Sequence, residues 1–331
     1  MQSIAERVSV LIVSWNEAAL LSRCVQSILR AMPTPPQIVI VDNGSTPPLQ
    51  PLVGTHWIRS EENLGFAGGN NLGLSACTGD YLLLLNNDTC LPDKEPIESL
   101  VNFLDTHPTV AAVQAKMQRP DGTLDTCGEF LTAWGVLYHH GYCQPDGAHA
   151  QHPFPIYAAK AACCLIRKSA LAAVGNTLFQ NNYFCYGEDI ELCHRFWKAD
   201  LEVWFVPTHP ILHLERATSS KLPSRKIWRH YLSNLLSTAC HHWDFLLWLR
   251  LGPGLLGMLV ISALLKGVLP KSHPHSITTK SLRSSKDFLT HTYVRVPLRY
   301  LFCCLTRNFK HCCYPLPSST STCESLTTRI P

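Results

Sequence analysis

The chain has 331 residues, of which 46% are hydrophobic and 16% charged, as in a globular protein that buries a large core. Its length allows roughly two domains, or one large domain with an appendage. Glu6 and Arg7 interrupt the first residues, so we expect no secretory signal, and an odd count of 15 cysteines favours reduced thiols over a disulfide framework.

The net charge of +4 is unevenly distributed. Residues 266–331 contain ten Lys and Arg residues and two acidic residues, which give a local charge of +8. The preceding residues contain 18 basic and 22 acidic side chains, which give −4. A basic tail favours an anionic partner such as a membrane surface or a nucleic acid. The alternative is a solvated, disordered tail.

The first half of the chain alternates apolar strands with helical stretches. Predicted strands cover residues 8–14, 37–42 and 80–85, with a short apolar segment near Trp57 and Ile58; a helix is expected over about 17–31, and a Gly/Asn loop entering a helix over 62–77. Strands that are apolar on both faces and alternate with helices indicate a parallel α/β sheet covered on both sides.

Polar residues follow these strands where a ligand would bind. Ligands of such sheets bind at the carboxyl ends of the strands. The ends expected to meet at one edge are Ser14-Trp15-Asn16-Glu17, Asp42-Asn43-Gly44-Ser45 and Asn86-Asn87-Asp88.

The second half predicts strands over 157–168 and 201–207 and a helix over 187–200, followed by a segment with His209 and His213. Residues 245–269 are apolar but broken at 252–254, and the 15 residues between Arg250 and Lys266 are fewer than the roughly 20 needed to span a bilayer. We expect broken helices at the membrane interface, with buried core helices as the alternative. The last thirty residues are assigned no fold; their paired cysteines match no standard zinc spacing, and lipidation remains open.

The polar edge has the chemistry of a nucleoside diphosphate site. Asp42 can accept hydrogen bonds from a base or ribose, and glycines in the loop after it allow close approach to backbone NH groups. Asp88 can hold a divalent cation, since Mg²⁺ typically takes one or two carboxylates and substrate phosphates. A dinucleotide-binding glycine loop is disfavoured because that motif follows the first strand.

Five motifs now stand in one order: VSVLIVSWNE, IVIVDNGST, ENLGFAGGNNLGL, GDYLLLLNNDT and GEDIELCHR. In this order they resemble family 2 glycosyltransferases with the GT-A fold, most closely the rhamnosyltransferase-like branch that builds bacterial cell-surface polysaccharides. The resemblance covers about residues 8–270. It implies a Rossmann-like, mainly parallel twisted sheet flanked by helices over 1–240, followed by apolar membrane-interface helices over 241–270. Composition and charge predict a basic, Ser/Thr/Cys-rich and poorly ordered tail over 271–331.

The resemblance also implies roles for individual residues. Asp189 matches the general base, with Glu188 beside it, and Asp88 matches the metal ligand of the Asp-X-Asp motif, completed by His213. The implied nucleotide-sugar contacts are Trp15, Asn16, Glu17, Asp42, Asn63, Gly65, Asn70, Asn86 and Asn87. Family 2 enzymes invert the anomeric centre: a base takes the acceptor proton, and Mg²⁺ or Mn²⁺ stabilises the departing diphosphate.

Each role has a structural alternative. Asp189 and Glu188 can be helix N-terminal acids, Asp42 a turn residue and His213 a structural histidine, with His209 as the ligand instead. Lys160, Arg167 and Arg216 can meet a phosphate or a lipid carrier, or remain surface charges.

This sequence departs from the branch at several positions. Asn86 replaces the first metal-motif acid, Asn87 a proline, Ala161 a glycine and Glu191 an aspartate. A Gly-Phe-Asp-Glu run is also missing after Gly175. The acceptor side is therefore the least transferable part.

The sequence thus predicts an inverting hexosyltransferase, plausibly for rhamnose, that uses a dTDP- or UDP-sugar and Mg²⁺ or Mn²⁺. The expected acceptor is a cell-surface glycan or a lipid-linked glycan, with the protein peripheral on the anionic cytoplasmic face of the membrane and no nucleic-acid partner. One alternative is a catalytically degenerate scaffold that binds a nucleotide sugar or glycan. Another is a nucleotidyltransferase, which is disfavoured because this sequence has no basic glycine-rich loop directly after the first strand.

Overall fold

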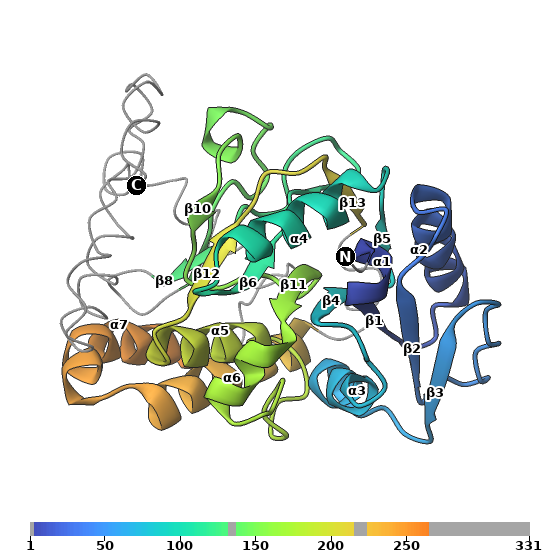
Figure 1. The fold of residues 1–331 in the computed structure, drawn as a ribbon. Helices are drawn as coiled ribbons and strands as arrows, with labels where there is room; N and C mark the ends of the chain where they lie inside the picture. Colours follow the sequence, from blue (N-terminus) through green and yellow to red (C-terminus); the bar gives the residue numbers. More distant parts are fainter. Residues whose placement is uncertain (1–2, 132–136, 215–223, 265–331) are drawn as a thin grey trace, which may run out of the picture.

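A computed structural model describes residues 3–131, 137–214 and 224–264. The basic tail, its paired cysteines and Arg216 lie outside these ranges. The centre of the molecule is an eight-stranded sheet (Figure 1). In spatial order its strands are β10 (Phe154–Pro155), β12 (Glu202–Phe205), β6 (Val110–Gln114), β11 (Cys163–Arg167), β4 (Tyr81–Leu85), β1 (Val8–Ser14), β2 (Gln37–Asn43) and β3 (His56–Ser60).

The sheet is mainly parallel, as the sequence predicts. Strands β4, β1, β2 and β3 run parallel to one another, and β6 runs parallel to β12. Strand β11 is antiparallel to both β4 and β6, and β10 is antiparallel to β12. The strand expected over 157–168 begins only at Cys163, and β6 was not foreseen.

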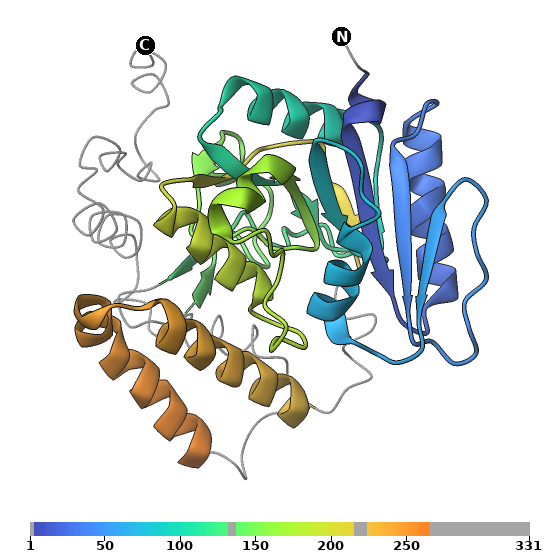
Figure 2. The same ribbon diagram turned by 60° about the horizontal axis from the view of Figure 1, so that its bottom comes forward.

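Two apolar layers cover the sheet. Along β4, Leu83 and Leu85 join one cluster, while Leu82 and Leu84 join the other, because successive strand residues face opposite sides. The first cluster packs against α2 (Ala18–Ala31) and α4 (Glu95–Thr106), beside the short α1 (Ile4–Arg7). The second packs against α3 (Gly65–Leu74), α5 (Glu188–Lys198) and the 3₁₀ helix η2 (Lys168–Val174). Figures 1 and 2 show these helices on the two sides of the sheet.

Two helices close the α5 side. Helices α6 (Ser224–His242) and α7 (Phe245–Leu264) form a hairpin below α5 (Figure 2). Leu247, Leu251 and Leu255 of α7 are buried in the cluster shared with α5. The break expected at 252–254 is wrong: α7 continues through Pro253. Among the described residues, no helix is both long and apolar enough to cross a membrane.

Smaller sheets complete the carboxyl edge. Strand β13 (Ile211–His213) lies between β5 (Thr89–Cys90) and β7 (Met117–Gln118), and β8 (Glu129–Leu131) pairs with β9 (Leu137–His139). A single 3₁₀ turn, η1 (Ala148–Ala150), follows β9. The pairing of β13 with β5 aligns His213 with Thr89, directly after the turn that follows β4.

Candidate active site

The polar ends of β1, β2 and β4 meet at one edge, as expected. Ser14 is in register with Asp42 on the neighbouring strand. The Asn87 amide donates to Ser14 Oγ at 2.9 Å, which ties the turn after β4 to the end of β1. Asn16, held in the left-handed region with φ 58°, donates its backbone NH to Ser45 Oγ at 2.9 Å. Trp15 and Glu17 beside it are partly exposed.

Asp42 is fully buried and bonded on both oxygens. Oδ1 accepts the Ser45 backbone NH at 3.1 Å, and Oδ2 accepts the Leu49 backbone NH at 3.1 Å together with the Arg59 guanidinium. The loop held in this way borders a hollow of about 310 Å³. Its lining residues are Asn16, Ala18, Leu21, Thr46, Pro47, Pro48, Leu49, Gln50 and Leu52.

The glycine-rich segment, expected as a loop entering a helix, is already helical from Gly65 onward. Its glycines serve close packing: a Cβ on Gly69 would lie 2.7 Å from Val13 of β1. Gly65 begins α3 with φ 76° against the Phe184 carbonyl, a conformation and an approach that favour glycine. Asn70 is buried and donates to Phe66 O of its own helix at 2.8 Å.

Asn63 is positioned by Asn43 at the end of β2. The Asn43 amide donates to Asn63 Oδ1 at 3.1 Å and to Gly65 O at 2.9 Å. Asn63 Oδ1 in turn accepts the Gly65 backbone NH at 2.9 Å. The start of α3 is therefore fixed beside the polar edge.

His213 lies against Asp88, the pair that the sequence resemblance nominates as metal ligands. Its Nε2 is 3.3 Å from Asp88 Oδ1, and its Nδ1 is 2.8 Å from Asp125 Oδ2. All three side chains are buried. Burial alone would lower the pKa of His213, but the hydrogen bonds and charges of the two carboxylates raise it to about 9.

Asp125 was not singled out from the sequence. Its carboxylate also accepts Lys160 Nζ, at 2.7 Å and 2.9 Å, so Lys160 is an ion-pair partner rather than a surface charge. Burial alone would raise the pKa of Asp125, but Lys160 and His213 hold it well below its usual range. Asp125 lies in an irregular loop, where sequence periodicity gives no signal.

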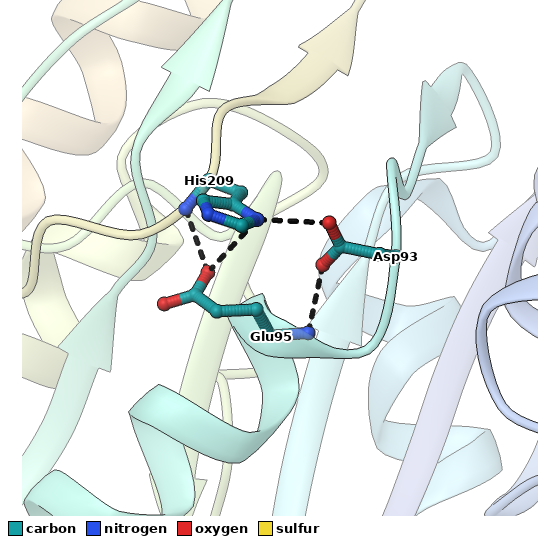
Figure 3. Close-up of side chains that lie close together, drawn as sticks. All are labelled: Asp93, Glu95 and His209. Carbon is teal, nitrogen blue, oxygen red and sulfur yellow. Dashed lines mark hydrogen bonds and ion pairs between the residues drawn. The ribbon is translucent and has the colours of Figure 1, made fainter.

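His209, the alternative ligand, belongs to a separate cluster shown in Figure 3. Its Nδ1 lies 2.8 Å from Asp93 Oδ2, and its backbone NH donates to Glu95 Oε2 at 2.7 Å. The potential ligand atoms of the three residues lie within 4.8 Å of one another. The His209 side chain is 61% exposed, and the cluster joins the loop before β13 to the start of α4. It includes none of the residues at the polar edge.

Asp189 is the second residue of helix α5. Its Oδ2 accepts the Ala161 backbone NH at 3.1 Å, and its Oδ1 accepts the Ile190 NH at 2.9 Å. Burial and the neighbouring Glu129 carboxylate raise its pKa to about 7. Burial likewise raises the pKa of Glu188 well above its usual value, and the charge of Asp189 adds to this.

Glu129 of β8 was also missed by sequence reasoning. Its Oε1 lies 3.1 Å from His139 Nδ1. In the described part of the chain, neither its buried Oε2 nor the buried Oε2 of Glu188 has a hydrogen-bond partner. Desolvated carboxylates that lie near one another disfavour ionisation, which accounts for the raised pKa values on this side.

Residues 160–162 connect the Asp125 network to Asp189. Lys160 Nζ bonds Asp125, the Ala161 NH bonds Asp189, and the Ala162 carbonyl accepts the Asn86 NH at 2.9 Å. One short segment therefore contacts Asp125, Asp189 and the turn after β4. We call it the 160–162 bridge.

Two further predicted residues have structural partners. Arg167 donates to backbone carbonyls of Val110, Leu104 and His107, which indicates a packing role. Glu191 is fully buried and bonds both Arg195, at 2.9 Å, and His242 of α6, at 2.8 Å.

Residues 9–143 match the family described as Glycosyl transferase family 2. The chain is 24% identical over 241 residues to the O-antigen biosynthesis protein RfbC of Myxococcus xanthus, covering 68% of this chain and 19% of that protein. It is 21% identical over 267 residues to N-acetylglucosaminyl-diphospho-decaprenol L-rhamnosyltransferase of Mycobacterium tuberculosis, covering 70% of this chain and 84% of that protein. With the pre-mycofactocin glycosyltransferase of the same organism it shares 30% identity over 228 residues, or 66% of this chain and 45% of that protein.

A crystal structure of GalNAc-T7 with UDP, GalNAc and Mn²⁺ has a similar fold. Its TM-score is 0.56 at 15% sequence identity, and the match covers 83% of this chain and 53% of that chain. At this identity the likeness shows a shared GT-A-like α/β fold and nothing finer.

Proposed function

We propose that the chain, whose residues 9–143 match glycosyl transferase family 2, is an inverting hexosyltransferase, as its similarity to proteins of O-antigen biosynthesis and rhamnosyl transfer supports. The donor is a nucleoside-diphosphate sugar, either a dTDP- or a UDP-sugar, and the transferred sugar is rhamnose or another hexose. The acceptor is a hydroxyl of a cell-surface or lipid-linked glycan. The observation that carries this proposal is the 160–162 bridge, which links Asp189, through Lys160 and Asp125, to the Asp88–His213 pair.

On this proposal Asp189 is the general base. It is partly exposed, and a pKa of about 7 lets its carboxylate accept a proton from the attacking hydroxyl near neutral pH. Beside it, the pKa of buried Glu188 is also raised, by burial and by the charge of Asp189, so ionisation of both carboxyl groups together is disfavoured.

Asp88 and His213 fit a divalent cation. Their facing atoms are 3.3 Å apart, close enough to be ligands of one ion, and the other nitrogen of His213 bonds a carboxylate, as it usually does in metal-binding histidines. Imidazole is a poorer ligand for Mg²⁺ than oxygen, so we expect Mn²⁺ to bind more tightly than Mg²⁺. When bound, the cation neutralises charge on the leaving diphosphate.

The nucleotide is proposed to lie at the ends of β1 and β2. Trp15, Asn16 and Glu17 are accessible there, and Asn16 borders the hollow beside the 46–52 loop. Asp42 and Asn63 shape this site through the bonds that hold that loop and the start of α3. Asn70, buried within α3, supports the packing of that helix. Asn86 and Asn87 position the turn that carries Asp88.

Helix α7 is proposed to lie on the anionic cytoplasmic face of the membrane. Phe245, Leu246, Leu249 and Leu256 are 54–77% exposed and fall on one side of the helix, opposite the buried leucines. The basic sequence from residue 266 follows directly, and apolar helix faces beside basic segments favour anionic lipid surfaces.

The test is a panel of dTDP- and UDP-sugars with the purified chain, with and without Mn²⁺ or Mg²⁺. Metal-stimulated release of nucleoside diphosphate from one donor, lost in Asp189→Asn, supports the transferase. Tight donor binding without release, even with a membrane extract as acceptor, supports instead a degenerate scaffold. The absence of both donor binding and diphosphate release would contradict both the transferase and the scaffold.

A further inference from the structure

Asp125 determines which nitrogen of His213 faces Asp88. A carboxylate only accepts hydrogen bonds, so His213 Nδ1 at 2.8 Å must be the donor. The ring is thereby fixed with Nε2 toward Asp88, at 3.3 Å. Asp125 is fully buried, and its two oxygens are shared between His213 and Lys160.

Asp125 is itself held in place by backbone contacts. Its NH donates to Met117 O at 3.0 Å. The buried Gln114 side chain connects two segments of this network, donating to Thr126 O at 2.8 Å and accepting the Lys160 NH at 2.8 Å. Gln114 thus links the residue after Asp125 to the first residue of the 160–162 bridge.

We propose that Asp125 is a positioning residue that orients His213 for cation binding and, through Lys160, keeps the cation side in fixed geometry with the base. The inference rests on the proposed function for its assumption that Asp88 and His213 hold the cation. Outer partners of this kind usually affect metal affinity about 10–100-fold. Asp125 touches neither the cation nor the substrate; it acts through His213.

Mn²⁺ binding to the full chain, measured without substrate from the electron paramagnetic resonance signal of free Mn²⁺, tests this proposal. Asp125→Asn should weaken Mn²⁺ affinity about 10–100-fold, because the amide leaves His213 and Lys160 without their charged partner. The matched control is Asp146→Asn, which breaks another pair with a buried lysine, Lys116 at 3.0 Å, and should keep wild-type affinity. Wild-type affinity in Asp125→Asn would overturn the proposal, as would equal losses in both variants.

A measurement on unaltered protein covers the case in which Asp125→Asn does not fold. In chain labelled with ¹⁵N-histidine, the His213 ring, assigned by its absence in His213→Asn, should carry a slowly exchanging proton on Nδ1. Small additions of Mn²⁺ should broaden that ring before other histidine signals. An unprotonated Nδ1, or a ring unaffected by Mn²⁺, would refute the positioning role.

Failure of the proposed function looks different. A chain that binds Mn²⁺, loses affinity in Asp125→Asn and yet releases no diphosphate from any sugar nucleotide would retain the positioning role without the transferase. A chain that turns over its donor but shows no Mn²⁺ binding would retain the transferase and overturn the positioning role.

Discussion

Asp125 and Asp189 lie on either side of the 160–162 bridge and are both bonded to it, yet their environments differ. Asp125 faces two basic groups, Lys160 and His213, which lower its pKa despite burial. Asp189 is desolvated next to Glu129, and its pKa rises to about 7. Burial strengthens the effect that neighbouring charges have on the pKa of a carboxyl group. One aspartate therefore stays ionised and orients its neighbours, whereas the other has the basicity that proton transfer near pH 7 requires.

The largest expected effect separates the two sides by activity. Asp189→Asn should lower kcat about 10²–10⁴-fold, the usual contribution of a general base, and leave Mn²⁺ affinity unchanged. Diphosphate release and Mn²⁺ titration measure the two quantities. Asp121→Asn, which removes the charge of an exposed aspartate that hydrogen-bonds locally to Thr123, is the control for loss of a charge. An active Asp189→Asn would assign the base elsewhere.

The next effect tests the cation side. His213→Asn should weaken Mn²⁺ binding by about 100-fold or more, since a direct ligand contributes at least as much as its outer partners. His209→Asn should not, because His209 bonds Asp93 and Glu95 instead. The two histidines lie four residues apart, which makes them a matched pair for the same titration. The reverse result would place the cation in the cluster of Figure 3.

The pH profile of kcat/KM tests the raised pKa of Asp189. Below a pKa of about 7 the carboxylate is protonated and accepts no proton, so activity should rise about tenfold per pH unit up to roughly pH 7 and then level off. Glu129→Gln removes the neighbouring charge, lowers the pKa of Asp189 and should move this rise to lower pH. An unmoved profile would mean that Glu129 does not influence the base.

The smallest effect concerns the exposed face of α7. Leu249→Glu should weaken binding to anionic vesicles roughly tenfold, from the lost transfer of one leucine side chain into the lipid interface. Val53→Glu, at a residue 94% exposed in the loop between β2 and β3, should bind as wild type does. Cosedimentation with vesicles of defined anionic lipid content measures both, and equal binding by all three proteins would contradict the membrane proposal.

Strand periodicity and the polar strand ends were enough to predict the sheet edge, because β1, β2 and β4 are continuous apolar runs with in-register carboxyl ends. Asp125 and Glu129 could not be predicted, since their partners are 88 and 10 residues away and lie in irregular or very short elements. The glycines of α3 were assigned to ligand approach, whereas Gly69 and Gly73 pack against side chains of β1. Proximity of that kind is a property of the packed molecule and leaves no local pattern.

The Glu191–His242 bond joins the helix that carries Asp189 to the hairpin that carries the exposed face of α7. If α7 lies on a membrane as proposed, this link fixes the distance between the lipid surface and Asp189. An acceptor would then be selected by the distance between its reacting hydroxyl and its membrane anchor, because that distance must match the distance of Asp189 from the lipid surface. Chain length of the anchored glycan then becomes a criterion of substrate choice alongside the identity of its terminal sugar.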